Sequence, residues 1–150
     1  MYQTIRDHFS TLRRTSKARH RDIADTFKIS EGELIAVHVG MADDDSPSIL
    51  QATRLRPEWS AIIESLEPLG EVMALTRNAS CVHEKTGVYR KASHHNQRGL
   101  VLGGEIDLRV FYHQWAHGFA VSEQSEQGVQ RSLQFFDAAG TAVHKIFLKP

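Results

Sequence analysis

The sequence has few of the features that mark secreted, membrane-spanning or phosphate-binding proteins. Its single cysteine, Cys81, cannot form an internal disulfide, and neither a secretory leader nor an apolar run of about 18 residues is present. The ten glycines are scattered and form neither a phosphate-cradling loop nor a dinucleotide fingerprint. The formal net charge is zero, from 18 basic and 18 acidic side chains, so no overall field attracts nucleic acid or an anionic membrane. These absences predict a cytoplasmic protein with no nucleic-acid partner and no membrane insertion.

The first third of the chain has the pattern of short helices. Apolar residues recur at helical spacing from Ile5 onward. Ser30, with Glu33 three residues later, is a capping-box signature for a further helix. We therefore expect residues 1–40 to be helical. The acidic stretch 41–48 has no periodicity, and we expect it to be a mobile loop.

After a strand and a helix within residues 52–68, the rest of the chain is predicted to be almost entirely strand. The segments with strand character are 72–76, 81–89, 99–102, 106–112, 119–123, 131–136 and 142–148. Consecutive strands without helical crossovers must be antiparallel. We therefore expect a single α+β domain over 1–150. A large antiparallel β-sheet of about seven or more strands would occupy 71–148, with the N-terminal helices packed on one face.

The last two strands are predicted to form a hairpin. The short sequence DAAG at 137–140 separates them and provides a glycine for a left-handed turn. We expect His144 and Lys145 to lie on the surface of this hairpin. Trp59 and Trp115 are predicted to be core residues.

Residues 22–34 have the apolar spacing of a helix-turn-helix, whose second helix would enter a DNA major groove. That second helix would begin with Glu31, Gly32 and Glu33, and carboxylates at this end would meet phosphates. A basic stretch, 13–21, lies just upstream. A DNA-binding regulator therefore stays open beside the favoured interpretation, a plain pair of helices that covers the sheet.

Histidine is unusually frequent, with nine residues, but no spacing indicates a firm metal or nucleophile site. The adjacent histidines at 94–95 are expected to be solvated in a polar loop. His113 and His117 have the i, i+4 spacing of a helical zinc pair, without the glutamate of the H-E-x-x-H motif and in a strand-rich segment. Cys81 and His83 would share one face of a strand as a thiolate–imidazole pair, although a buried, inert cysteine is the simpler prediction.

One strand alternates in a way that suggests a binding surface. Its apolar positions predict a buried face, and its other positions set a cation, an aromatic ring and an imidazole on the opposite face. The apolar positions are Ile106, Leu108, Val110 and Tyr112, and the others are Asp107, Arg109, Phe111 and His113. Such a row could hold a large, flat, anionic ligand. The structural alternative is that Arg109 pairs with Glu123 or Asp107 and that Phe111 packs under a helix.

Several uncommon strings point to a known family. They are RDIA at 21–24, SEGEL at 30–34, LGEVMALTRN at 69–78, CVHEKTG at 81–87, GLVL at 99–102, IDLRVF at 106–111, RSLQFFD at 131–137 and HKIF at 144–147. In this order they resemble the bacterial hemin-degrading factor and heme-transport family, of the HemS/HmuS type. The resemblance spans nearly the whole chain. It is specific because several uncommon strings occur in the same order as in the family.

The resemblance implies a cytoplasmic heme-binding protein of heme uptake and iron acquisition. It would act as a heme carrier, as a heme-degrading factor that releases iron, or as both, and degradation would require an external reductant and O₂. Family members usually contain two similar halves, and this chain matches the first. That half contributes a distal arginine, which corresponds to Arg109 and would be the catalytic residue of an enzyme. It also contributes a ring-packing phenylalanine, which corresponds to Phe111. His83 matches a secondary candidate for coordinating the heme iron, while the principal proximal histidine belongs to the second half.

The resemblance also implies partners besides heme. The missing half would come from a second copy, in a homodimer, or from a C-terminal half in a longer chain. A heme importer or a heme oxygenase would exchange heme with the protein. Two other functions stay open, a non-catalytic heme-storage or interaction module and the DNA-binding regulator.

Overall fold

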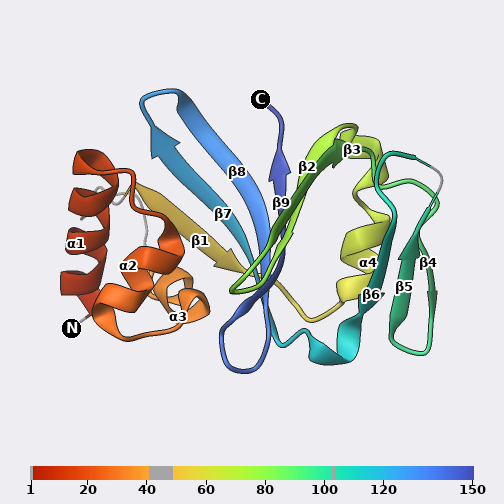
Figure 1. Ribbon diagram of the computed structural model, residues 1–150, viewed down its shortest axis with the longest axis horizontal. Coiled ribbons are helices and arrows are strands. Elements are labelled where there is room, and N and C mark those ends of the chain that lie inside the picture. The colour runs from red at the N-terminus through yellow and green to blue at the C-terminus, as the bar shows by residue number, and fades with distance from the viewer. Residues whose placement is uncertain (1, 41–48, 103) are drawn as a thin grey trace.

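The computed structural model describes residues 2–40, 49–102 and 104–150, and Figure 1 shows the path of the chain. The helices are α1 (Tyr2–Thr15), α2 (His20–Phe27), α3 (Glu31–Ala36) and α4 (Trp59–Glu64), with 3-10 turns η1 (Glu67–Leu69) and η2 (Tyr112–Gln114). The strands are β1 (Leu50–Arg54), β2 (Val72–Arg77), β3 (Val82–Gly87), β4 (Ser93–His95), β5 (Arg98–Val101), β6 (Leu108–Phe111), β7 (His117–Ser125), β8 (Gly128–Phe136) and β9 (Ala142–Leu148). The predicted acidic loop, 41–48, lies outside the described residues. None of the described helices is long and apolar enough to cross a membrane.

The strands form two antiparallel sheets, which confirms the α+β prediction but divides the expected single sheet. The large sheet has six strands in the order β1-β7-β8-β9-β2-β3, and the small sheet has three in the order β4-β5-β6. The 3-10 turn η2 redirects the chain after β6, so β6 pairs back onto β5 while β7 pairs with β1 and β8. Strand β4 was not predicted: the histidine pair expected in a loop lies on it, paired with β5.

The large sheet separates two hydrophobic cores, because neighbouring side chains on a strand point to opposite faces. Phe135 belongs to the core between the sheet, α4 and the small sheet, whereas Phe136 belongs to the core under α1, α2 and α3. Figure 1 shows these two groups of elements on opposite sides of the large sheet. The N-terminal helices therefore cover one face, as predicted, and α4 with the small sheet covers the other. Trp59 and Trp115 are core residues, as predicted.

Helix α3 packs by its first turn against the C-terminal hairpin. Ser30 is its N-cap, as predicted, and the Ser30 hydroxyl accepts a hydrogen bond from the Glu33 N–H at 3.1 Å. The Glu31 carboxylate forms an ion pair with the buried Lys145 of β9. The Gly32 N–H donates to the Gly140 carbonyl at 2.9 Å. Glu31 and Gly32, two of the three residues at the start of the predicted recognition helix, are thus engaged with the C-terminal hairpin, which favours the interpretation of a helix pair that covers the sheet.

Candidate functional site

Strand β6 has the alternation that the sequence predicts. Val110 is buried at 7% exposure, while Arg109 is exposed and Phe111 remains 47% exposed. The row of outward side chains is shorter than expected, because the strand begins at Leu108 and the chain turns into η2 at Tyr112. Arg109 and Phe111 are the part of the predicted row that lies on the strand.

These two side chains line a shallow pocket of about 220 Å³, which we call the Arg109 pocket. It lies where β6 meets β2 and β9 of the large sheet. Its lining residues are Thr76, Leu108, Arg109, Val110, Phe111, Gln114, Trp115, Val143 and His144. None of them carries a carboxylate. An exposed guanidinium beside an exposed aromatic ring suits a flat ligand with an anionic group.

Arg109 does not make the structural pairings considered for it. Glu123 is engaged elsewhere, accepting a hydrogen bond from the Arg13 Nε at 2.9 Å and lying 2.8 Å from the His20 Nε2. Among the described residues, no ion pair joins Arg109 to Asp107 or to any other acid. Nor does Phe111 pack under a helix. The guanidinium is therefore available to a ligand.

His83 lies on the same face of the large sheet as the pocket, but outside its lining. It is exposed on β3, the edge strand, and its direct cross-strand partner is Thr76. Directly opposed residues of an antiparallel pair project to one face. Thr76 lines the Arg109 pocket, so His83 stands one strand farther out. The fold thus brings Arg109 and Phe111 together and leaves His83 at the rim of that face.

A buried histidine that the sequence prediction missed forms part of the pocket floor. His144 was expected on the hairpin surface with Lys145, but their exposures are only 5% and 8%. The His144 Nδ1 lies 3.0 Å from the Thr76 hydroxyl, and its Nε2 lies 2.6 Å from the Tyr89 hydroxyl. Burial lowers the pKa of His144 to about 4, so its ring is neutral at pH 7. Both ring nitrogens are engaged, and neither is free to bind a metal.

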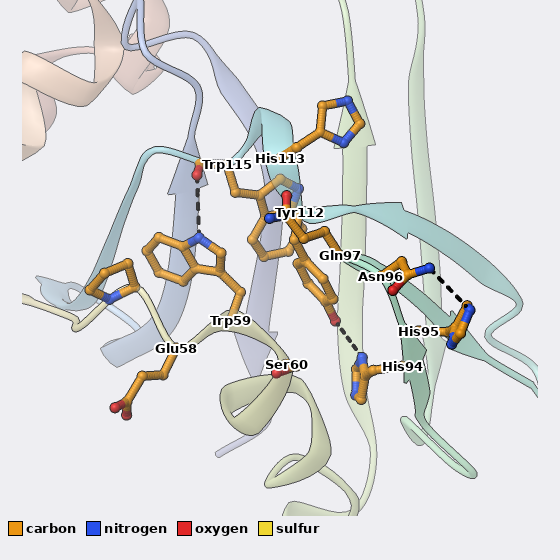
Figure 2. Close-up of a pocket in the computed structure, with 11 residues that line it drawn as sticks. Glu58, Trp59, Ser60, His94, His95, Asn96, Gln97, Tyr112, His113 and Trp115 are labelled. Carbon is orange, nitrogen blue, oxygen red and sulfur yellow. Dashed lines mark hydrogen bonds between the residues drawn. The ribbon is translucent and has the colours of Figure 1, made fainter.

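A larger pocket of about 550 Å³ lies between the start of α4 and the β4–β5 hairpin. Figure 2 shows the Tyr112 hydroxyl directed at His94, with 3.3 Å between the oxygen and the Nδ1. His94 also lies 3.3 Å from the Glu64 carboxylate, so it is held in place and not free in a loop. The Trp59 indole N–H donates to the Trp115 carbonyl at 3.2 Å (Figure 2).

The remaining reactive side chains are dispersed. Cys81 is exposed, so the expectation of a buried cysteine is wrong. It sits in the β2–β3 turn, where its backbone N–H donates to the Asn78 side chain at 2.9 Å. His113 and His117 lie in η2 and β7, not one helical turn apart on one helix. Within the described residues, no three histidine, cysteine, aspartate or glutamate side chains gather closely enough to hold a metal ion.

Comparison with known proteins agrees with the resemblance noted in the sequence. The family model of the haemin-degrading HemS.ChuX domain matches residues 28–150. The hemin transport protein HmuS of Yersinia pestis is 39% identical over 139 residues, which cover 89% of this chain and 38% of that protein. The hemin transport protein HemS of Yersinia enterocolitica is 40% identical over 129 residues, covering 85% of this chain and 35% of that protein.

A solved structure shares both fold and sequence. The crystal structure of holo-PhuS, a heme-binding protein from Pseudomonas aeruginosa, matches with a TM-score of 0.84 and 43% identity, covering 99% of this chain and 40% of that chain. The chain therefore spans less than half the length of the relatives it matches. The fold, the matched domain and these identities lead to one conclusion: this chain belongs to the haemin-degrading HemS/ChuX family.

Proposed function

We propose that this domain binds heme in heme uptake and iron acquisition, as a carrier or as a component that degrades heme, and that the Arg109 pocket forms one wall of its heme site. The observation that carries the proposal is the exposed Arg109 guanidinium, which forms no ion pair with any described residue, beside the half-exposed Phe111 ring. The names of the similar proteins support it, since HmuS and HemS are hemin transport proteins and PhuS is a heme-binding protein.

The chemistry of the lining fits a porphyrin. The Phe111 ring and the apolar Val143, which both line the pocket, can pack on the porphyrin face. The Arg109 guanidinium can donate hydrogen bonds to a propionate or to an oxygen ligand at the iron. The pocket is too small and too open to enclose a porphyrin, so it supplies one side of a site. Heme itself supplies the iron chemistry, with an external reductant and O₂ if the ring is opened.

His83 is the proposed iron ligand from this chain. It is exposed, it stands on the same sheet face as Thr76, and a neutral imidazole is a normal axial ligand of heme. His113, whose ring centroid lies 6.4 Å from that of Phe111, is the alternative. His144 is unsuitable, because Tyr89 and Thr76 occupy both of its nitrogens.

A second protein surface would supply the other side of the site. We propose a second copy of the chain, in a homodimer, or a C-terminal half in a longer chain, since this chain spans less than half of its relatives. In the cytoplasm, a heme importer or a heme oxygenase would be the protein that delivers or receives the heme.

Titration with hemin tests this function. We expect a shifted Soret band with wild-type protein, and Arg109→Ala should weaken binding by about 10- to 100-fold, the effect of one lost hydrogen bond to a charged group. Phe111→Ala should also weaken binding, and His83→Ala should change the axial-ligand spectrum. Matched controls are Arg131→Ala on β8 and His95→Ala on β4, both exposed and outside the Arg109 pocket.

Two results would count against the proposal. One is the absence of any spectral shift at micromolar hemin. The other is equal affinities for Arg109→Ala and Arg131→Ala. Loss of the Soret band with ascorbate would favour heme degradation, and its persistence would favour a carrier or storage role.

A further inference from the structure

A buried hydrogen-bonded pair lies directly beneath the Arg109 pocket. The Tyr89 side chain is 1% exposed, and its hydroxyl lies 2.6 Å from the His144 Nε2. On the other side of the imidazole, the Nδ1 lies 3.0 Å from the Thr76 hydroxyl oxygen. Thr76 is itself exposed and lines the pocket. The three side chains therefore form a continuous path from the core to the pocket surface.

The position of each proton along this path follows from the burial of Tyr89. In the described part of the chain, the His144 Nε2 is the one hydrogen-bond partner of the Tyr89 hydroxyl. A buried hydroxyl needs an acceptor for its proton, so Tyr89 donates to Nε2. A neutral imidazole with an accepting Nε2 carries its proton on Nδ1. Nδ1 therefore donates to the Thr76 oxygen. Burial supports this assignment, since it raises the pKa of Tyr89 and lowers the pKa of His144 to about 4.

This arrangement determines what Thr76 can offer a ligand. Its oxygen accepts from His144, so the hydroxyl proton is free to point away from the core and into the pocket where Arg109 lies. The pocket then has a hydroxyl donor and a guanidinium donor and no carboxylate among its lining residues. Such a set of donors recognises an oxygen that carries negative charge.

We propose that Thr76 is a ligand-binding residue of the Arg109 pocket, oriented as a hydrogen-bond donor by the buried Tyr89 and His144 side chains, and that it binds an anionic oxygen together with Arg109. The inference rests on the proposed function, in which the ligand is heme. The oxygen belongs either to a propionate or to a group bound at the iron. Tyr89 and His144 are positioning residues, since they act through Thr76.

The tautomer of His144 tests the positioning without any ligand. Long-range ¹⁵N–¹H correlation spectra of the wild-type protein should show a neutral His144 with its proton on Nδ1. Tyr89→Phe removes the donor to Nε2, so the Nε2–H form should gain population. Tyr112→Phe is the matched control, because it truncates another buried tyrosine that contacts a different histidine, His94. An Nε2–H tautomer in the wild-type protein would overturn the proposed orientation.

Binding of three porphyrins tests the role of Thr76. Thr76→Val removes the hydroxyl and keeps the side-chain shape, so hemin affinity should fall about tenfold, while Thr76→Ser should retain it. If Thr76→Val lowers the affinity for iron-free protoporphyrin IX equally and does not change the affinity for hemin dimethyl ester, the Thr76 hydroxyl contacts a propionate. If Thr76→Val lowers the affinity only for porphyrins that contain iron, the Thr76 hydroxyl contacts an iron-bound oxygen. Tyr89→Phe should cause a similar loss of hemin affinity, because it removes the hydroxyl that orients His144 and, through it, Thr76.

The failure of this inference is distinguishable from the failure of the proposed function. If Arg109→Ala weakens hemin binding and Thr76→Val does not, the role of Thr76 is wrong and the heme site stands. If neither variant changes hemin affinity, the Arg109 pocket is not the heme site, and both fail.

Discussion

Glu123 is a buried carboxylate that joins two N-terminal helices to the large sheet. It is 6% exposed on β7 and is bonded to Arg13 of α1 and to His20, the first residue of α2. Burial by itself would raise the pKa of Glu123. The hydrogen bonds and charges of His20 and Arg13 outweigh burial, and the pKa lies below its ordinary value. The carboxylate is therefore ionised in the folded protein at pH 7.

Glu123→Gln should lower the free energy of unfolding by about 2 kcal/mol, because it weakens hydrogen bonds to a buried charged group. Urea denaturation at pH 7 measures the effect. The control is Glu71→Gln, which breaks an ion pair of 2.8 Å with Lys149 on the surface, where both side chains are about half exposed. A change of at most about 1 kcal/mol is expected there. Equal effects of the two variants would show that the Glu123 cluster contributes no more to stability than an exposed surface ion pair.

Two buried histidines make stability depend on pH. Burial lowers the pKa of His38 and of His144 from 6.5 to about 4. Below pH 6.5 the unfolded chain binds protons that these residues cannot bind when folded, so stability is lost as the pH falls from 6.5 toward 4. Each residue should contribute a loss of roughly 2 kcal/mol at pH 5.

Urea denaturation at pH 7 and pH 5 measures this dependence. In His38→Leu, the difference in unfolding free energy between the two pH values should shrink by about the contribution of one histidine. His95→Leu, at an exposed position of β4, serves as the control and should leave the difference unchanged. If His38→Leu also leaves the difference unchanged, folding does not lower the pKa of His38.

Individual residues differ in how well the sequence predicts them. Arg109 and Phe111 could be predicted, because an edge strand that covers a core on one side shows a clean alternation. His144 could not, because β9 lies between β8 and β2 and is covered on both faces, where alternation carries no signal. Its hydrogen-bond partner Tyr89 lies 55 positions away in the sequence, so no local pattern indicates the contact.

At the scale of elements, the contact of α4 with the sheet depends on a glycine. A Cβ at Gly118 of β7 would lie 2.7 Å from the Trp59 ring and 3.1 Å from the Phe135 ring. The Trp59 and Phe135 rings meet edge to face, with 5.8 Å between their centroids. The absence of a side chain at Gly118 therefore lets α4 lie directly on β7 and β8.

Gly118→Ala should destabilise the protein by about 1–3 kcal/mol through overpacking. The matched substitution is Gly104→Ala, where the nearest heavy atom to a new Cβ lies at 3.8 Å. It should be close to neutral. Thermal unfolding of both variants measures the difference, and a stability of Gly118→Ala equal to that of Gly104→Ala would mean that Trp59 can move aside.

The sequence predicts the elements better than it predicts their assembly. The strand segments were located because their alternation is a local property. The division into two sheets depends on η2, a single 3-10 turn at Tyr112–Gln114, whose residues carry no breaker such as glycine or proline. The apolar spacing in α2 and α3 that resembles a helix-turn-helix serves to cover the sheet. Leu34 and Ile35 of α3, for example, are fully buried in the core between these helices and the large sheet.

At the scale of the whole molecule, the described residues form one wall of the proposed heme site. Under the proposed function, hemin should promote association of two copies when no second half is present. Sedimentation velocity with and without hemin measures this. We expect a shift toward dimer with hemin in the wild-type protein and a smaller shift in Arg109→Ala. Tight binding of one hemin to a protein that stays monomeric would contradict the need for a second surface.

The large sheet also governs how substitutions combine. Because it separates the core under α1 to α3 from the core beside the Arg109 pocket, side chains in one core have few neighbours in the other. Free-energy effects at separated sites add, whereas those of contacting residues couple. The N-terminal helices can therefore accumulate substitutions without changing the hydrogen bonds that join Tyr89, His144 and Thr76. The two cores of this small domain are free to evolve at different rates, because the large sheet separates them.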